Sequence, residues 1–479
     1  MLNVPATEPE WSSSVPARDR MPVYAVALGT LGLLAPLPFL GDLRENIIAC
    51  VALCVCATLF LYAGFHYFRR TGISVRDRDI LLVAVLLRLI VLPLQPSLSD
   101  DAWRYLWDGR LVAEGISPYH HIPADTALAK YHDELFALQG YPETNTIYPP
   151  VAQLIFAGAV SLAEPLGAGP LAAYYLYKLF LIAAELLAIW LLQHLLRHFR
   201  RSQTGAMLYA WHPLVVVELA GQGHTDGFWV LALALGIAGF VWNRAGKGLP
   251  GLAFGVVVRL FPILLLPLWA RFLRKRQLIA GAILSVPILL LLYVFLDPEA
   301  FQRYSTVAAR FTNYYEFNGG FYLGMKGVLD ALHIAPSNRI AGGITTAMML
   351  LGVAAITVWP LKRRTISALM VRVMGIVTLQ IGLSAKVHIW YFVLPLYLLA
   401  FIPDRRFAMA WLWAALIAPM TYLYYALEPH AELIPVVLTE WGGFVVLMVA
   451  GWAGERRKKN RPTPQEPDGI KLDANVRSA

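Results

Sequence analysis

Apolar segments long enough to cross a membrane recur along most of the chain, and this feature constrains the fold more than any other. A helix needs about 20 apolar residues to cross a hydrocarbon core about 30 Å thick. We expect such spans at 22–40, 47–68, 79–95, 171–196, 204–220, 225–242, 277–296, 339–360, 366–385, 388–402, 407–428 and 434–453. With 58% hydrophobic and 15% charged residues, the 479-residue chain is too apolar for a soluble enzyme or a disordered scaffold. The sequence therefore predicts an all-α, polytopic integral membrane protein.

Two further apolar segments do not fit a straight span. The stretch 248–270 is interrupted by Arg259 and Pro262, and a straight helix would place the arginine in the middle of the membrane. We therefore expect two short half-helices that meet at Arg259. The stretch 148–164 begins with Tyr-Pro-Pro. We expect it to be re-entrant or to lie in the membrane interface.

The net charge of +9 is distributed in short basic clusters between the apolar segments, so it indicates membrane topology and not nucleic-acid binding. The clusters are Arg69/Arg70/Arg76/Arg78, Arg197/Arg200/Arg201, Arg244/Lys247, Arg271/Arg274/Lys275/Arg276, Lys362/Arg363/Arg364, Arg405/Arg406 and Arg456/Arg457/Lys458/Lys459. All of them lie on the cytoplasmic side if the chain starts inside, if 248–270 goes out and returns, and if 148–164 is re-entrant or lies in the interface. We expect a cytoplasmic segment 1–21, a membrane bundle 22–453 with external loops 96–147 and 297–338, and a disordered cytoplasmic tail 454–479.

The first external loop contains a helix signature, SLSDDAWRYLWDGRLVAEGISPY. Ser99 or Asp100 is a suitable N-cap, and Gly115 is a suitable C-terminal stop. At 3.6 residues per turn, one stripe of this helix carries Asp101, Arg104 and Asp108. The other stripe is apolar, with Trp103, Trp107 and Leu111, and we expect it to rest on the membrane surface.

The paired acids of this loop have a simple and a functional interpretation. In the simple one, Asp100 caps the helix and Asp101 complements its dipole, each contributing about 1 kcal/mol or less. The functional interpretation is a catalytic carboxylate at the membrane boundary. It is favoured by the crowding of two acids and by the rigid TIYPPVAQL segment around Tyr148 that ends the loop.

Other ionisable residues lie at or within membrane depth. Arg259 is either a snorkelling cation or a phosphate ligand. Lys386 and His388 in SAKVHIWYF form a second positive group or an interfacial anchor. His224 and Asp226 in GQGHTDGF lie at a turn that is either solvated or part of a cavity rim.

Three further features complete the set of candidates. Asn318 in TNYYEFNGG belongs to a sugar-contact surface of aromatics and amides, together with Asn313, Tyr314, Tyr315 and Glu316, or to a solvated loop. Arg88, in the third predicted span, either serves as an equivalent charge or pairs with an acid. We expect no metal site, since the spacing of the possible ligands matches no tight zinc pattern, although a need for a divalent metal stays open. These ligands are His120, His121, Asp125 and His132.

The loop motifs also resemble a known superfamily. The segment SDDAWRYLWDGRLVAEGISPY followed by IYPPVAQLIF is similar to the first external loop of GT-C membrane glycosyltransferases, closest to bacterial polyprenyl-phosphate-mannose-dependent mannosyltransferases. Later stretches are similar in the same order: WHPLVVVELAGQGHTDGF, FGVVVRLFPILLLPL, RYSTVAARFTNYYEFNGGFY and SAKVHIWYFVLPL. The resemblance covers about residues 80–400. This chain differs by having three predicted spans before the acidic loop, where the simplest members have one.

The resemblance implies a GT-C type helical bundle in the plasma (inner) membrane that transfers a hexose, with mannose expected, on the non-cytoplasmic face. It implies a polyprenyl-phosphate sugar donor, a glycan or lipid-linked acceptor, and inversion at the anomeric carbon. A loop acid is the base in such enzymes, so Asp101 or Asp100 would take this role. Arg259, Lys386 and His388 would bind the donor phosphate. The candidate substrate contacts are Arg104, Asp108, Tyr148, His224, Asp226 and Asn318.

Two other function classes stay open at this point. A transporter or flippase for a polar lipid would also place charges in the membrane, although it predicts charges spread through the membrane depth. A glycan polymerase or ligase with an undecaprenyl-diphosphate donor would use similar loops. No soluble α/β region for a nucleotide sugar is evident, which favours a donor carried by a lipid.

Overall fold

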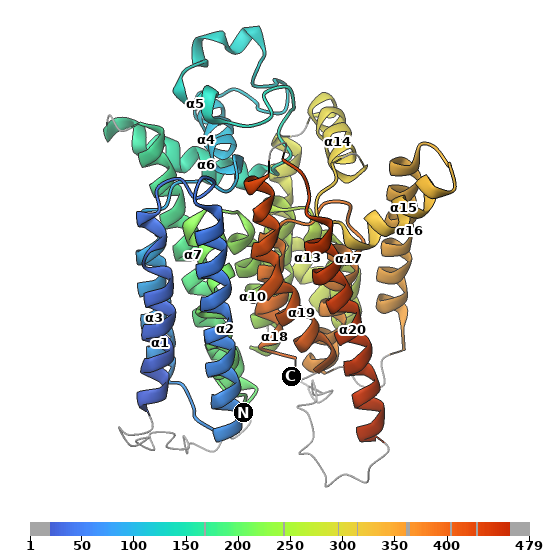
Figure 1. Ribbon diagram of the computed structural model, residues 1–479. Helices are drawn as coiled ribbons and strands as arrows, with labels where there is room; N and C mark the ends of the chain where they lie inside the picture. Colours follow the sequence, from blue (N-terminus) through green and yellow to red (C-terminus); the bar gives the residue numbers. More distant parts are fainter. Residues whose placement is uncertain are drawn as a thin grey trace, which may run out of the picture.

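The computed structural model describes residues 20–166, 169–242, 245–295, 297–313, 315–360, 365–402, 405–427 and 430–459. Over these ranges the chain is an all-α, polytopic membrane bundle, as the sequence predicts, and its β-structure is limited to isolated bridges at Lys386 (Figure 1). In the same ranges, seven helices are long and apolar enough to cross a membrane, or eight if one sharply bent pair forms a single span.

The first three helices form an up-and-down group (Figure 1). They are α1 (Met21–Leu34, continued by η2, Leu37–Phe39), α2 (Ile47–Thr71) and α3 (Asp77–Val91). Arg69 and Arg70 lie in the last turn of α2, where the helix dipole favours cations, and α2 ends at Gly72 with a φ of +73°. Arg88 of α3 forms a fully buried ion pair with Glu185 of α7 (Pro170–His198). The interpretation that Arg88 pairs with an acid is therefore confirmed.

The expected continuous span 204–220 is wrong. This segment is broken into α8 (Thr204–Ala210), α9 (Pro213–Val215) and the π-helix η5 (Val216–Gly221), and the α9–η5 axis then bends by 114° into α10 (Asp226–Val241). Pro213 cannot donate a backbone hydrogen bond, so it favours the first break. The buried Lys178 ammonium donates to Gly221 O and to two carbonyls after α3. Irregular backbone is tolerated at membrane depth when protein groups satisfy it in this way.

The expected break at Arg259 is confirmed, because α11 (Ala245–Val258) ends immediately before it and η6 (Phe261–Leu265) and α12 (Leu266–Phe272) follow it. The remaining helices of the bundle are α13 (Lys275–Phe295), α16 (Ser337–Val358), α17 (Ile366–Gly382), η7 (Ile389–Phe392), α18 (Val393–Leu399), α19 (Arg405–Ile417), η8 (Ala418–Ala426) and α20 (Ile434–Lys459).

Several predicted bounds need correction. The spans expected at 79–95, 366–385 and 388–402 are shorter than a full crossing, since α3 has 15 residues, α17 has 17 and α18 has 7. The tail was expected to begin at residue 454, but α20 continues to Lys459. Residues 460–479, like residues 1–19, lie outside the described part.

Ion pairs and hydrogen bonds join three of the predicted cytoplasmic clusters. Arg197 binds Asp77, which lies between Arg76 and Arg78. Arg201 donates to Phe401 O at 2.6 Å, close to the cluster at 405–406. These clusters therefore meet at one end of the bundle. Which side of the membrane this end faces stays a prediction.

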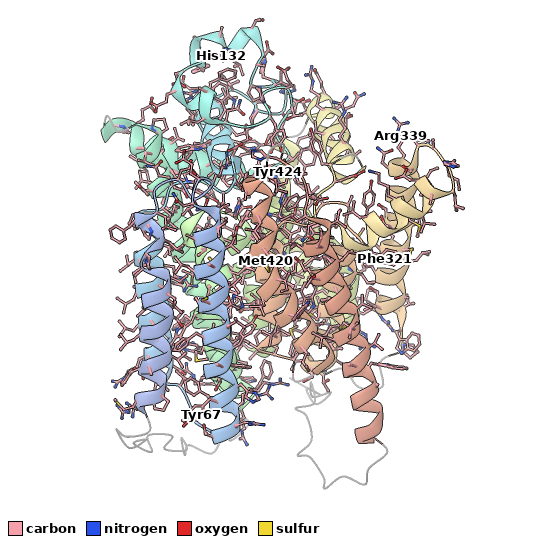
Figure 2. All side chains as sticks on the ribbon, in the orientation of Figure 1. Tyr67, His132, Phe321, Arg339, Met420 and Tyr424 are labelled. Atoms are coloured by element: carbon pink, nitrogen blue, oxygen red, sulfur yellow. The ribbon has the colours of Figure 1, made fainter. Side chains whose placement is uncertain are left out.

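The two external segments gather at the other end, away from the start of α1 and the end of α20 (Figure 1). They contain α4 (Asp101–Ala113), η3 (Thr126–Tyr131), α5 (Glu134–Leu138), α6 (Pro150–Ala163, continued by η4, Glu164–Leu166), α14 (Pro298–Asn313) and α15 (Gly320–Ala331). In Figure 2, His132 marks the tip of the first segment and Tyr424 lies beneath it, whereas Tyr67 lies at the opposite end.

The predicted helix at the acidic loop is confirmed as α4, but its predicted position on the membrane surface is wrong. Its apolar stripe is buried, including Trp103 and Trp107, and so are Arg104 and Asp108 of its charged stripe. The helix packs very closely on α6, since a Cβ at Gly109 would lie 2.5 Å from the carbonyl carbon of Phe156. Protein, not lipid headgroups, therefore covers the aromatic stripe.

Candidate active site

A cavity of about 760 Å³ lies beneath the external segments, where loops from distant parts of the sequence meet. Its walls come from the start of α4, the segment 140–149, the break at 258–261, the segment 315–317, the connection 383–391 and the end of η8. Seven of the predicted site residues line it together: Asp100, Asp101, Arg104, Tyr148, Arg259, Lys386 and His388. The other four, Asp108, His224, Asp226 and Asn318, are buried behind its walls.

Asp100 does not cap α4, although it occupies the N-cap position. Its carboxylate instead accepts a hydrogen bond from the Arg44 guanidinium at 2.6 Å. The Ser99 hydroxyl oxygen accepts a hydrogen bond from the backbone N–H of Asp101. Arg44 in turn lies over the Tyr425 ring, 4.9 Å from its centroid. The capping interpretation of Asp100 is therefore wrong, and its negative charge is compensated by an arginine from the connection between η2 and α2.

Asp101 differs from its neighbour in having no such partner. In the described part of the chain, no hydrogen bond or ion pair engages its carboxylate, which is half-buried and faces the cavity. A carboxylate that is held on a rigid helix and still has free lone pairs can accept a proton from a bound hydroxyl. Of the two acids, Asp101 is thus the one in a position to act as a base.

Arg104 and Asp108 form a hydrogen-bond network that holds one wall of the cavity in place. The Arg104 guanidinium binds the Asp108 carboxylate at 2.8 Å and also donates to Tyr141 O and Thr144 O, at 3.2 and 2.9 Å. Gln153 of α6 donates to the other Asp108 oxygen at 3.3 Å. This buried network fixes the segment 141–146 on α4, so Asp108 contributes to the shape of the cavity and not to its lining.

Arg259 faces the cavity but is paired from behind. Its guanidinium donates to Asp226 Oδ2 at 2.5 Å and lies 4.8 Å from the centroid of the Tyr391 ring. The side chain is 16% exposed, so Arg259 does not snorkel to the aqueous surface. The break between α11 and η6 directs this cation to the cavity, and Asp226 compensates its charge.

Lys386 and His388 are positioned by a short two-stranded contact. Val387 N–H donates to Phe317 O at 2.7 Å, and Phe317 N–H donates to Ala385 O at 3.1 Å. The Lys386 ammonium lies 5.4 Å from the Tyr315 ring, and burial lowers the pKa of Lys386 although the charge of Asp101 opposes this shift. His388 lies between the rings of Phe317 and Trp390, at 5.3 and 4.2 Å. A second cation and an imidazole are thus presented near the acids.

His224 and Asn318 are not in the positions expected from the sequence. His224 stacks on the inner face of Trp390 at 3.5 Å, with Nε2 at 3.4 Å from the buried Glu218 carboxylate. The side-chain amide of Asn318 donates a hydrogen bond to the Glu440 carboxylate of α20 at 3.1 Å. The backbone carbonyl of Asn318 accepts a hydrogen bond from the indole N–H of Trp441. Both residues therefore support cavity walls from behind.

The histidines of the first external loop have separate partners. His121 pairs with Asp125 at 2.8 Å, His120 pairs with Asp297 of the second external segment at 2.9 Å, and His132 contacts Pro123 O. Within the described ranges, no three His, Cys, Asp or Glu side chains are grouped as metal ligands.

The sequence interpretation missed Arg44 and three tyrosines of the cavity, Tyr141, Tyr424 and Tyr425. Arg44 lies in the outer connection between α1 and α2, where the distribution of basic residues predicts no arginine, and this exception was an available signal. Tyr424 and Tyr425 end an apolar run, where they look like ordinary interfacial residues. Nothing in the sequence around Tyr141 indicates that it reaches the cavity.

Comparison with known proteins gives a family for this chain. The model of a family described as alpha-(1->6)-mannopyranosyltransferase, N-terminal domain, matches residues 24–274, which is more than half of the chain. The chain belongs to this family. The matched range contains both loop acids, Arg44 and the Arg259–Asp226 pair, whereas Lys386 and His388 lie beyond it. The resemblance to GT-C mannosyltransferases that the loop motifs indicate is thus confirmed.

A curated relative agrees with this assignment. The chain is 25% identical to alpha-(1->6)-mannopyranosyltransferase A of Mycobacterium tuberculosis (strain ATCC 25618 / H37Rv) over 212 residues. This alignment covers 43% of the chain and spans 39% of the length of the relative.

Proposed function

We propose that this family member is an integral membrane mannosyltransferase that takes mannose from a polyprenyl-phosphate donor and transfers it to a hydroxyl of a glycan or lipid-linked acceptor. The family and its relative support the sugar, and the cavity supports the type of donor. The cavity combines the Asp101 carboxylate, which has no hydrogen bond or ion pair within the described residues, with the cations Arg259 and Lys386 at the end of an apolar bundle. A lipid-linked donor matches all three features. Its sugar would lie near the carboxylate, its phosphate near the cations, and its long apolar chain along the bundle.

The observation that carries the proposal is the contrast between the two loop acids. Asp100 is neutralised by Arg44, whereas Asp101, which no side chain of the described ranges binds, presents its carboxylate to the cavity that also contains Arg259 and Lys386. A base on one side and cations on the other are the groups that glycosyl transfer from a phosphate requires. This contrast selects Asp101 over Asp100 as the base.

In the proposed reaction, Asp101 accepts the proton of the acceptor hydroxyl as its oxygen attacks C1 of the mannose. The new C1–O bond forms on the face opposite the phosphate, so the configuration at C1 is inverted. The old C1–O bond breaks, and polyprenyl phosphate leaves with the electron pair. Arg259 and Lys386 stabilise the charge that develops on this phosphate. General base catalysis of this kind contributes roughly 10² to 10⁴-fold.

The basic clusters favour a site on the non-cytoplasmic face of the plasma (inner) membrane. The cavity lies at the end of the bundle away from the joined clusters at Arg197 and Arg201. Positively charged connections stay in the cytoplasm, so the cavity would face the periplasm or the exterior. A lipid-linked donor, unlike a nucleotide sugar, is available on that side.

The test is transfer by the purified protein in nanodiscs. Synthetic polyprenyl-phosphate mannose and a short α-(1→6)-linked mannoside would be supplied, with the Asp101→Asn variant as the control. We expect a longer mannoside whose new linkage has the anomeric configuration opposite to that of the donor. Transfer from a nucleotide sugar or from a polyprenyl diphosphate would reject the proposed donor. Movement of the lipid across the membrane without a new glycosidic bond would indicate a flippase instead.

A further inference from the structure

We propose that four tyrosines at the cavity, Tyr141, Tyr315, Tyr424 and Tyr425, form a platform that binds the sugar rings of an uncharged glycan. This inference rests on the proposed function, because it assigns the acceptor that the transfer reaction leaves open. The four residues come from three segments that are far apart in the sequence, and all of them line the cavity. We refer to them below as the tyrosine platform.

The rings of the platform form two perpendicular pairs. Tyr141 and Tyr315 have ring centroids 6.0 Å apart with an interplanar angle of 86°, and Tyr424 and Tyr425 have centroids 5.5 Å apart with an angle of 82°. Phe317 contacts Tyr424 at 6.2 Å and so connects the segment of Tyr315 to η8. Tyrosine provides a rigid apolar face and a polar hydroxyl at low entropic cost, which suits the alternating C–H and O–H groups of a sugar.

The platform borders the two acids. A Cβ at Gly140 would lie 3.2 Å from Cβ of Asp100, so the backbone that leads into Tyr141 passes directly beside this aspartate. In the pair of Tyr424 and Tyr425, the Tyr425 ring lies under the Arg44 guanidinium that binds Asp100. A sugar on these rings would therefore present its hydroxyls to the neighbouring Asp101, which is where the acceptor has to lose its proton.

Tyr141 is held in an unusual conformation that exposes its ring. Its φ is +61°, a region that side-chain-bearing residues rarely adopt, and its carbonyl is fixed by Arg104 and by the backbone and hydroxyl of Thr144. The residue is nevertheless 50% exposed. Backbone strain that is maintained by a buried network is a feature of functional sites. The network of Arg104 and Asp108 thus fixes the backbone from which this aromatic ring extends to the cavity.

The charges around the platform favour an uncharged ligand. Four carboxylates line the cavity beside it: Asp100, Asp101, Glu316 and Glu432. Glu316 is paired with Lys326 at 2.6 Å and Asp100 with Arg44, so the two acids without an ion pair among the described residues are Asp101 and Glu432. Arg44 is already bound to Asp100, and Lys386, next to the Tyr315 ring, marks the side assigned to the donor phosphate. A glycan that carries carboxylates or phosphates would be repelled by these acids. A neutral glycan has no such cost.

The experiment compares a neutral and an anionic oligosaccharide of equal length on the full-length protein in nanodiscs. The probes are α-(1→6)-linked mannotetraose and tetragalacturonate. For Tyr141→Ala and Tyr424→Ala we expect the acceptor KM for mannotetraose to rise about tenfold, with the donor KM changed less than about twofold. Tyr141→Phe keeps the aromatic face and should stay near the wild type. Tyr67→Ala, at the opposite end of the bundle, is the matched control (Figure 2).

Binding of mannotetraose without donor, followed by saturation-transfer NMR, separates this inference from the proposed function. Binding that depends on Tyr141 would support the platform even if no transfer were detected. Efficient transfer with an unchanged acceptor KM in both alanine variants would overturn the platform and leave the proposed function intact. Preferred binding of tetragalacturonate would overturn the assignment of a neutral ligand. If an alanine variant does not fold, Tyr141→Leu and Tyr424→Leu keep apolar volume without the ring and give the same comparison.

Discussion

The Arg259 guanidinium binds the Asp226 carboxylate at 2.5 Å and thereby ties the break between α11 and η6 to the first residue of α10. Their side chains are only 16% and 6% exposed. Removing one partner of a buried ion pair costs about 3 to 5 kcal/mol, since the other charge is left uncompensated. A donor phosphate would therefore share Arg259 with Asp226, and a single substitution of Arg259 affects folding as well as binding.

Substitution of both partners separates these two effects. We expect Arg259→Ala to lower the melting temperature and to raise the donor KM, and Arg259→Lys to do both to a smaller extent, because it keeps the charge but loses the planar fork. The double variant Arg259→Gln/Asp226→Asn removes both charges. It should regain much of the lost stability while the donor KM stays high. Thermal unfolding and steady-state kinetics in nanodiscs measure the two quantities.

A double variant with normal stability and a normal donor KM would show that Arg259 only compensates the charge of Asp226 and does not bind the donor. The phosphate site would then have to be sought at Lys386 and His388.

The two loop acids should differ in their effect on turnover. We expect Asp101→Asn to lower kcat by about 10² to 10⁴-fold, the range of general base catalysis, without loss of expression or donor binding. Asp100→Asn should have a smaller effect, and Arg44→Ala a similar one, since these two residues form one ion pair. Initial rates of mannose transfer give the comparison.

The matched control for these variants is Asp125→Asn, which removes another external-loop acid that is hydrogen-bonded to His121. It should transfer mannose at the wild-type rate. Equal losses in Asp100→Asn and Asp101→Asn would contradict the assigned difference between the acids, and near-normal turnover in both would place the base elsewhere.

Much of this site follows from local signals in the sequence. The N-terminal helix signature before Asp101 and the interruption of an apolar segment by Arg259 and Pro262 each depend on neighbouring residues alone, and both are confirmed as structural features. The basic clusters likewise indicate which connections lie together.

The errors concern side chains whose environment is set by distant segments. The face of α4 with Trp103 and Trp107 looks suited to a membrane surface, yet Tyr174 of α7 and Phe136 of α5 contact these two rings. His224 looks like a rim residue because of its glycines, but it packs behind Trp390, which lies 166 positions later in the sequence. The Arg44–Asp100 pair joins residues 56 positions apart. Such partners depend on tertiary packing and have no local pattern.

Lys386 should make donor binding sensitive to alkaline pH. Burial lowers the pKa of this lysine, in the connection between α17 and η7, so it loses its proton at a lower pH than a free lysine does. Only the protonated ammonium attracts the phosphate, and the donor KM should therefore increase as the pH rises from about 7 to about 10. Lys386→Arg stays charged over this range and should remove most of the increase. Steady-state kinetics at each pH give the result, and the same increase in the arginine variant would exclude Lys386 as its source.

The placement of the cavity outside the cytoplasm can be tested by labelling single cysteines. The background would replace Cys50, Cys54 and Cys56 by alanine, and Ala129→Cys or Thr71→Cys would then be introduced at exposed positions of the first external segment and of the end of α2. A membrane-impermeant maleimide should label position 129 in intact cells and position 71 only after permeabilisation, because Arg69 and Arg70 hold the end of α2 in the cytoplasm. Transfer activity of the cysteine-free background confirms that it folds.

Labelling of position 71 in intact cells, with position 129 protected, would reverse the topology. The cavity would then face the cytoplasm, where nucleotide sugars are available, and the argument for a lipid-linked donor would lose its basis.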